Sequence, residues 1–222
     1  MKLLVATSNA GKLVEIREIL AGIALELLSL REVRLPAPDE TGATFHDNAA
    51  QKSTICARQS GLWTLADDSG LCVDALGGAP GVHSARYAPT DQERRARLLQ
   101  ALRGIPEEKR TAYFFCAVAL SPPEGERILR AEGQVDGSIA LEERGTNGFG
   151  YDPLFLPAEA PGKTLAELDS TEKNRLSHRG RALARLRPVL ERLARDGAVR
   201  SLIHALKPCT SPPLSAGRSA AW

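Results

Sequence analysis

Apolar and polar positions follow each other along the chain in blocks with two different periods. An apolar run at 2–8 predicts a buried strand. Residues 10–21 predict a helix, because their apolar positions recur at three- and four-residue spacing and Gly22 follows as a stop. A second strand is expected at about 24–30. Strands that alternate with helices in this way indicate an α/β fold.

The next blocks continue this alternation. Thr44, with Asp47 three residues later, predicts a helix start, and Gly61 predicts the end of that helix. The stretch LWTLADDSGLCVDAL at 62–76 predicts a strand, a tight turn and a second strand, since Asp-Ser-Gly is favourable in turns. A charged helix is expected at about 90–103.

The second half of the chain predicts two long paired strands, at 111–120 and 127–137, joined by the turn SPPEGE. A glycine-rich loop at 145–153 leads into a short strand, and a last long helix is expected at about 177–194. Residues 197–206 predict a short helix. The remaining tail is rich in Pro, Ser and Gly and predicts disorder.

Composition narrows the class of protein. A chain of 222 residues with a net charge of +2 has room for one sizeable core, and it lacks the basic excess of a general nucleic-acid binder. No apolar run approaches the roughly 20 residues of a membrane span, and the start of the chain lacks the pattern of a signal peptide. We therefore expect a cytoplasmic protein without nucleic-acid or membrane partners. The scattered cysteines and histidines predict no zinc site.

The stretch TSNAGK at 7–12 links the first strand to the first helix. It is not a Walker A loop, because Ala6 stands at the first glycine position and Leu13 follows the lysine. A helix N-terminus still offers free N–H groups and a partial positive charge to a phosphate, and Lys12 lies at the same end. The simpler interpretation, an ordinary turn with a surface lysine, is open at this point.

Carboxylates gather in two stretches. Asp67 and Asp68 are adjacent in a strand, so their side chains face opposite sides, and a divalent cation is a suitable partner for a buried carboxylate. Glu40 lies in the loop before the second helix, on which Asn48 and Lys52 share one face. Turn chemistry and a solvated helix face are the simpler interpretations of the two stretches.

Two further stretches suit a nucleobase. In GFGYDP, residues 148–153, an aromatic ring between glycines can stack on a flat ring or pack over the edge of the core. In SHRG, Ser177 is placed to cap a helix, and His178 and Arg179 then lie at its positive end. Basic residues in a first turn interact unfavourably with the helix dipole. This small penalty favours the interpretation that a ligand binds there.

Taken together and in this order, TSNAGK, DETGATFHDNAAQK, ADDSGLCVDALGGAPGVHSARYA, GTNGFGYDPLF and KTLAELDSTEKNRLSHRG closely resemble the inosine triphosphate pyrophosphatase family. The resemblance covers residues 1–195, which we expect to form a nucleoside triphosphate pyrophosphatase domain, with 196–222 as a largely disordered extension. It implies a long curved mixed β-sheet with flanking helices, two lobes around a central cleft, and a homodimer.

The resemblance also implies roles for individual residues. Asp68 matches the catalytic aspartate and, with Glu40, the metal-linked acids for Mg²⁺. The residues that match substrate contacts are Thr7, Ser8, Asn9, Ala10, Gly11, Lys12, Lys52, Ser69, Phe149, Gly150, Tyr151, Asp152, Lys173, His178 and Arg179.

The activity that the resemblance implies is hydrolysis of ITP, dITP and XTP to the monophosphate and pyrophosphate. Three alternatives stay open. A related pyrophosphatase for modified pyrimidine nucleotides is opposed by the GFGYDP and SHRG stretches. A nucleotide-binding regulator without turnover would not need Asp68. An RNA-binding module would use the arginine-rich helices, but these lack interleaved aromatic residues.

Overall fold

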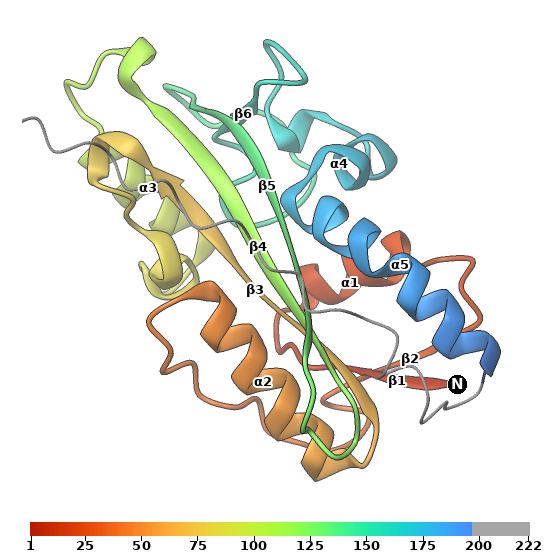
Figure 1. Ribbon diagram of the computed structural model, residues 1–222. Helices are drawn as coiled ribbons and strands as arrows, with labels where there is room; N and C mark the ends of the chain where they lie inside the picture. The colour runs from red at the N-terminus through yellow and green to blue at the C-terminus, as the bar shows by residue number, and fades with distance from the viewer. Residues whose placement is uncertain (197–222) are drawn as a thin grey trace, which may run out of the picture.

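The computed structural model describes residues 1–196, and a six-stranded sheet forms the centre of this part of the chain (Figure 1). The strands are β1 (Lys2–Val5), β2 (Glu26–Ser29), β3 (Trp63–Val73), β4 (Thr111–Ser121), β5 (Leu129–Ile139) and β6 (Phe155–Pro157). The α-helices are α1 (Ala10–Ile19), α2 (Phe45–Ser60), α3 (Asp91–Ala101), α4 (Ser170–Leu176) and α5 (His178–Asp196). Short 3₁₀ helices are η1 (Asp74–Leu76), η2 (Gly81–Arg86), η3 (Glu107–Lys109) and η4 (Leu165–Glu167).

The strand order is β2-β1-β3-β4-β5-β6, and the sheet is mixed. Strand β1 pairs in parallel with both β2 and β3, whereas the pairs from β3 to β6 are antiparallel. The long strands β3, β4 and β5 run together along the molecule and curve (Figure 1). The predicted α/β class with a curved mixed sheet is confirmed. The predicted helix at 197–206 and the predicted disordered extension lie outside the described residues.

One prediction about the sheet was wrong. Residues 62–76 do not form a strand, a tight turn and a strand, because β3 continues unbroken from Trp63 to Val73. Every residue from Thr64 to Val73 is paired with β4, so the Asp-Ser-Gly segment lies inside a strand. Its turn propensity is overridden because β4 offers a continuous partner and because side chains from other elements, described below, pair with both aspartates.

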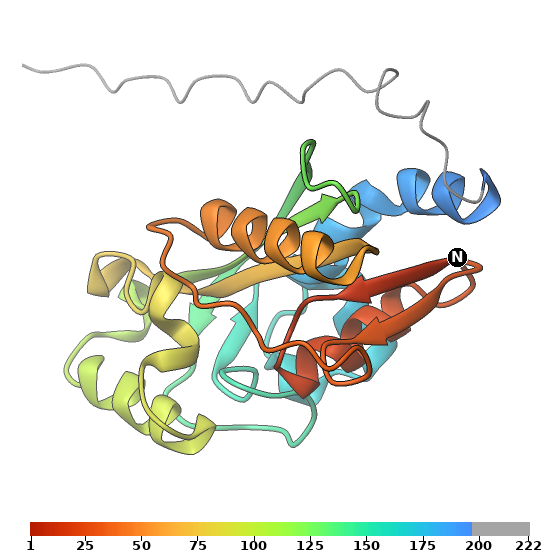
Figure 2. The same ribbon diagram turned by 90° about the horizontal axis from the view of Figure 1, so that it is seen from below.

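The two faces of the sheet are covered by different helices, as Figure 2 shows for α2 and α1. Leu3, Val5 and Leu65 pack with residues of α1 and α5, whereas Leu4 and Ala66 pack with Cys56 of α2 on the other face. The predicted start of α2 is confirmed, since the Thr44 hydroxyl accepts from the N–H of Asp47, and Gly61 ends it in a left-handed conformation. None of the helices within residues 1–196 has the length and apolar composition of a membrane span.

The face under α1 and α5 carries two separate hydrophobic cores. The first surrounds Leu65 of β3, and the second surrounds Leu71, with Asp67 and Ser69 between them on the same face. The first core packs against α1 and α5, and the second against α3, α4 and the loops around β6. Two lobes therefore meet at a polar band across the middle of the long strands.

Gly133 of β5 allows the start of α5 to lie directly on the sheet. A Cβ atom at this position would be 2.2 Å from the carbonyl oxygen of His178 and 2.6 Å from the N–H nitrogen of Ala182. Both contacts are with backbone, so a larger residue would force the helix away from the strand. This glycine therefore sets the height of the first turn of α5 above the sheet.

We expect Gly133→Ala to lower the free energy of unfolding by about 1–3 kcal/mol, the usual cost of overpacking a tight contact. Urea denaturation measures the change. Arg130→Gln, at an exposed position of the same strand, is the control and should unfold near the wild-type midpoint. A wild-type midpoint for Gly133→Ala would show that α5 does not depend on this close approach.

Candidate active site

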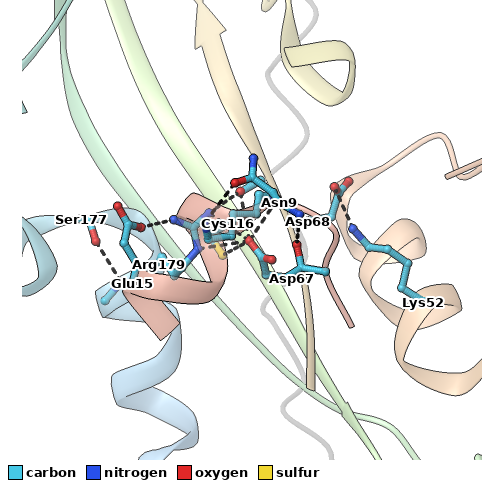
Figure 3. Close-up of polar contacts among 12 residues, drawn as sticks. Asn9, Glu15, Lys52, Asp67, Asp68, Cys116, Ser177 and Arg179 are labelled. Carbon is cyan, nitrogen blue, oxygen red and sulfur yellow. Dashed lines mark hydrogen bonds and ion pairs between the residues drawn. The ribbon is translucent and has the colours of Figure 1, made fainter. Parts of the chain in front are cut away.

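Two adjacent aspartates of β3 point to opposite faces of the sheet, and each meets its own cations (Figure 3). Asp67 is directed toward Arg179 at the start of α5, whereas Asp68 is directed toward Lys52 of α2. The prediction that the two side chains face opposite sides of the strand is confirmed. Both side chains are buried, so each depends on oppositely charged or hydrogen-bonding partners.

Asp67 joins two cations that come from distant parts of the sequence. Its Oδ2 atom lies 3.1 Å from Nζ of Lys12 and 3.0 Å from Nη2 of Arg179, and it accepts from the Ser69 hydroxyl at 3.2 Å. Burial alone would raise the pKa of Asp67, but Lys12 and Arg179 hold it well below its usual range. One carboxylate oxygen therefore links the turn after β1 to the first turn of α5.

A second buried network adjoins the first through Glu15 of α1. Glu15 pairs with Arg179 through one oxygen and with Nζ of Lys173, 2.5 Å away, through the other. Lys173 also donates to Asp152, which accepts from the backbone N–H of Phe149 at 2.8 Å. Burial alone would lower the pKa of Lys173, but the carboxylates of Asp152 and Glu15 raise it. The three elements α1, α4 and the glycine-rich loop are thus held together by charge.

His178 lies in the polar band with its ring stacked on Phe114 of β4. The ring centroids are 4.7 Å apart and the planes differ by 8°. Its Nδ1 atom is buried and, among residues 1–196, has no hydrogen-bond partner. Burial lowers the pKa of His178 well below its ordinary value, and the nearby charge of Arg179 lowers it further. His178 is therefore a neutral ring with a free polar atom.

A pocket opens beside these groups. It holds about 540 Å³ of empty space, including space open to solvent. The lining residues are Asn9, Lys12, Glu15, Ser69, Gly70, Ser84, Ala85, Asp91, Arg94, Phe114, Phe149, Gly150, Tyr151, Asp152, Lys173, His178 and Arg179.

The half-buried ring of Phe149 forms a wall of this pocket and reaches across to helix α1. A Cβ atom at Gly11 would be 2.5 Å from the Phe149 ring, so only glycine allows this contact. Lys173 and Arg179 lie over the ring at 5.0 and 5.8 Å from its centroid. The aromatic residue predicted for the base therefore stands between the two lobes.

On the other face, Asp68 is surrounded by groups from α2 and the loop before it. Asn48 donates to it at 3.0 Å, and Nζ of Lys52 lies 3.4 Å from Asp68 and 2.6 Å from Glu40. Burial raises the pKa of Asp68, against the opposing charge of Lys52. Burial would also raise the pKa of Glu40, but Lys52 outweighs it and the pKa is lowered.

The two faces of the sheet meet at an open edge of β3, beyond the point where β1 stops pairing with it. Strand β1 ends at Val5, next to Leu65, and the N–H of Ala6 donates to the carbonyl of Leu65. Because β3 continues beyond this point, the turn at 7–12 lies beside Asp67 and Asp68 where the sheet has stopped on that side. Asn9 caps α1 by accepting from the N–H of Lys12. Phosphates held at this turn would lie within reach of both faces.

The structure brings most of the predicted site residues to this band. Thr7, Asn9, Gly11 and Lys12 lie in or beside the turn at the edge, with Ser8 and Ala10 exposed within it. Tyr151 differs from its neighbours, since it is buried in the second core and its hydroxyl donates to the carbonyl of Ser84.

The sequence reasoning missed three residues of the band. Asp67 was discussed together with Asp68 but given no role in the site, and Glu15 and Phe114 were not singled out. The helical spacing of Lys12 and Glu15, three residues apart, is a signal that could have placed Glu15 beside the turn. The pairing of Phe114 with His178 joins a strand to a helix 64 positions later and left no local pattern.

The residues around Asp68 fit a hard divalent cation only together with further ligands. The described residues contain no group of three or more His, Cys, Asp or Glu side chains arranged to hold a metal. Glu40 and Asp68 supply two carboxylates, and the Lys52 ammonium now lies between them. Mg²⁺ commonly takes one or two carboxylates plus waters and substrate phosphates, so this pair suits a cation that arrives with a triphosphate.

Comparison with known proteins places this geometry among enzymes of one kind. The chain is 50% identical over 190 residues to a dITP/XTP pyrophosphatase of Geobacter sulfurreducens, covering 84% of this chain and 94% of that protein. It is 42% identical to a dITP/XTP pyrophosphatase of Anaeromyxobacter sp., covering 89% of this chain and all of that protein.

Solved structures agree with these sequence relatives. A HAM1 protein from Coxiella burnetii superposes with a TM-score of 0.77 at 44% identity, covering 86% of this chain and 99% of that one. The Staphylococcus aureus Ham1 protein gives 0.74 at 35% identity, covering 86% and 98%. The sequence profile of the Ham1 family matches residues 3–189, and the chain therefore belongs to the Ham1 family.

Proposed function

We propose that this protein hydrolyses deaminated purine nucleoside triphosphates, namely ITP, dITP and XTP, to the nucleoside monophosphate and pyrophosphate. The observation that carries the proposal is the placement of Asp67 and Asp68 at the open edge of β3. On one face of the strand lies the pocket with the neutral His178, and on the other lie Glu40 and Asp68 with Lys52. The turn at the N-terminus of α1 lies at the edge between these two faces. The names of the relatives support the same activity.

The phosphate side of the site is the turn at 7–12 together with Lys52. Free N–H groups in the first turn of α1 and the charges of Lys12 and Lys52 suit a triphosphate. Glu40 and Asp68 are the residues that would hold Mg²⁺, which when bound neutralises phosphate charge and helps to orient the reacting phosphoryl group. Lys12 and Lys52 stabilise the negative charge that develops on the leaving pyrophosphate.

Asp68 is the proposed general base. Its burial raises its pKa, which brings it closer to the range in which a carboxylate can take a proton at neutral pH. Water attacks the α-phosphorus in line and its proton passes to the Asp68 carboxylate. As the new P–O bond forms, the bond from the α-phosphorus to the bridging oxygen breaks, and pyrophosphate leaves with that oxygen and its electron pair. The side-chain amide of Asn48 donates to Oδ2 of Asp68 at 3.0 Å and holds the carboxylate in place.

The base side is the pocket at the start of α5. Phe149 stacks on the purine, and His178 and Arg179, with backbone N–H groups nearby, are the candidate donors to its 6-oxo group. The 6-amino group of ATP would place its N–H donors against the N–H donors of the protein, and such a mismatch strongly weakens binding. Phe149, Gly150, Tyr151, Asp152, Lys173 and Ser69 complete the proposed substrate contacts.

The domain boundary and the assembly are also part of the proposal. Residues 1–195 would form the catalytic domain with 196–222 as an extension, which agrees with the family match at 3–189. A homodimer and a cytoplasmic location stay predictions.

The substrate test is pyrophosphate and orthophosphate release from ITP, XTP, GTP, ATP and a modified pyrimidine triphosphate, with Mg²⁺ and with EDTA. We expect pyrophosphate from ITP and XTP at rates far above those for the other nucleotides, and no release in EDTA. Tight ITP binding without turnover would instead indicate a regulator. Orthophosphate from all substrates alike would contradict the proposed reaction.

We expect Asp68→Asn to reduce kcat for ITP at least about 100-fold, because the amide cannot accept the proton and binds a cation poorly. The matched control is Asp136→Asn, an exposed carboxylate on β5, which should keep wild-type activity. Steady-state pyrophosphate release measures both, with circular dichroism to confirm folding. Substantial activity in Asp68→Asn would assign the base elsewhere.

His178 should remain neutral throughout the physiological range. Its pKa in the folded chain is lowered, so the unfolded chain binds the extra proton first as the pH falls through about 6.5. This residue then removes up to about 1.4 kcal/mol of stability per pH unit below that value. NMR of the ¹⁵N-labelled imidazole should show no titration between pH 8 and 6. Titration of His178 at or above 6.5 would contradict a neutral ring at the base.

A further inference from the structure

The loop that carries Phe149 does not fix its own conformation. Gly148 and Gly150, on either side of the ring, have φ angles of 76° and 61°, in the left-handed region that glycine enters freely. A chain segment with this freedom needs contacts from outside the loop to hold one conformation. One contact comes from within the loop, since Asp152 accepts from the N–H of Phe149.

Helix α3, which packs in the same lobe as this loop, supplies two contacts from outside it. Oδ2 of Asp91 accepts from the N–H of Gly150 at 2.9 Å, and Nη1 of Arg95 donates to the carbonyl of Gly150 at 2.9 Å. Both backbone groups of the residue after Phe149 are therefore bound by side chains of one helix. Charge-assisted bonds of this kind are stronger than neutral ones.

The two side chains are themselves held in place. Asp91 pairs with Arg94 at 2.6 Å, and Nε of Arg95 lies 2.9 Å from Glu143. Helix α3 begins at a capping box, in which Thr90 and Glu93 bind each other's backbone N–H groups, so Asp91 lies in a well-defined first turn. Leu98 of the same helix is fully buried in the second core. The two side chains that bind Gly150 are thus anchored in the lobe around the second core, away from α1.

We propose that Asp91 and Arg95 are positioning residues that clamp Gly150 and thereby hold the Phe149 ring at the nucleobase pocket. The proposal rests on the proposed function, and it adds a determinant of base affinity outside the stretches that match the family's substrate contacts. Because the clamp acts on the base side, it affects binding of the purine more than cleavage at the phosphates. Loss of the clamp would let the ring leave the place where it meets Gly11.

The kinetic test uses Arg95→Met, which keeps much of the side-chain stem but removes the donors, and Asp91→Ala. For ITP we expect KM to rise about tenfold with kcat within about twofold of wild type, the effect of losing one charged hydrogen bond. Asp91→Asn keeps an acceptor and should restore much of the affinity. The matched control is Arg97→Met on the same helix, since Arg97 contacts Tyr87 instead of Gly150.

A double-mutant cycle shows whether the effect passes through the ring. In a Phe149→Ala background, Arg95→Met should change KM by less than about twofold, because the ring it positions is gone. A full tenfold effect in that background would overturn the proposal, as would a wild-type KM for Arg95→Met or a loss confined to kcat.

Hydrogen–deuterium exchange separates this proposal from the proposed function. In the nucleotide-free protein, Arg95→Met should speed exchange in the peptide containing Gly150, and Arg97→Met should not. Failure of wild-type protein to release pyrophosphate from ITP would remove the proposed function. Unchanged exchange in Arg95→Met, beside an active wild type, would remove the clamp alone.

Discussion

The arrangement of this site depends on the ion pairs made by a single carboxylate oxygen, Oδ2 of Asp67. It lies in the band between two hydrophobic cores and pairs with Lys12 from the turn after β1 and with Arg179 from α5. Arg179 is fully buried, and an unpaired buried charge is strongly destabilising, so the helix start and the strand are fixed to each other. Glu15 then adds Lys173 to the same group of charges.

This constraint explains how residues from separate stretches of the chain come to lie at one place. The alternation of β3 sends Asp67 toward Arg179 and Asp68 toward Lys52. Gly133 lets α5 lie low on the sheet, and Gly11 lets the ring of Phe149 reach the start of α1. Each feature is local, but together they give the proposed nucleotide site one group of side chains on each face of a single strand.

Much of this arrangement could be predicted from local patterns. Thr44 and Gly61 bound α2 as expected, and the strand period alone assigned Asp67 and Asp68 to opposite faces. The unbroken course of β3 was not predictable in the same way, because the turn propensity of Asp-Ser-Gly is visible locally and the pairing with β4 is not. Phe114 was not predictable for the same reason, since its partner His178 comes from a distant segment, and only the spacing of Glu15 from Lys12 offered a local signal for Glu15.

The central claim, that one nucleotide spans both faces of β3 at its open edge, is tested most directly by a crystal structure of Asp68→Asn with ITP and Mg²⁺. The account predicts the purine between Phe149 and the start of α5, and the triphosphate at the turn 7–12 beside Lys52. A triphosphate bound on the Arg179 side of the strand, or a purine bound outside the pocket, would contradict it.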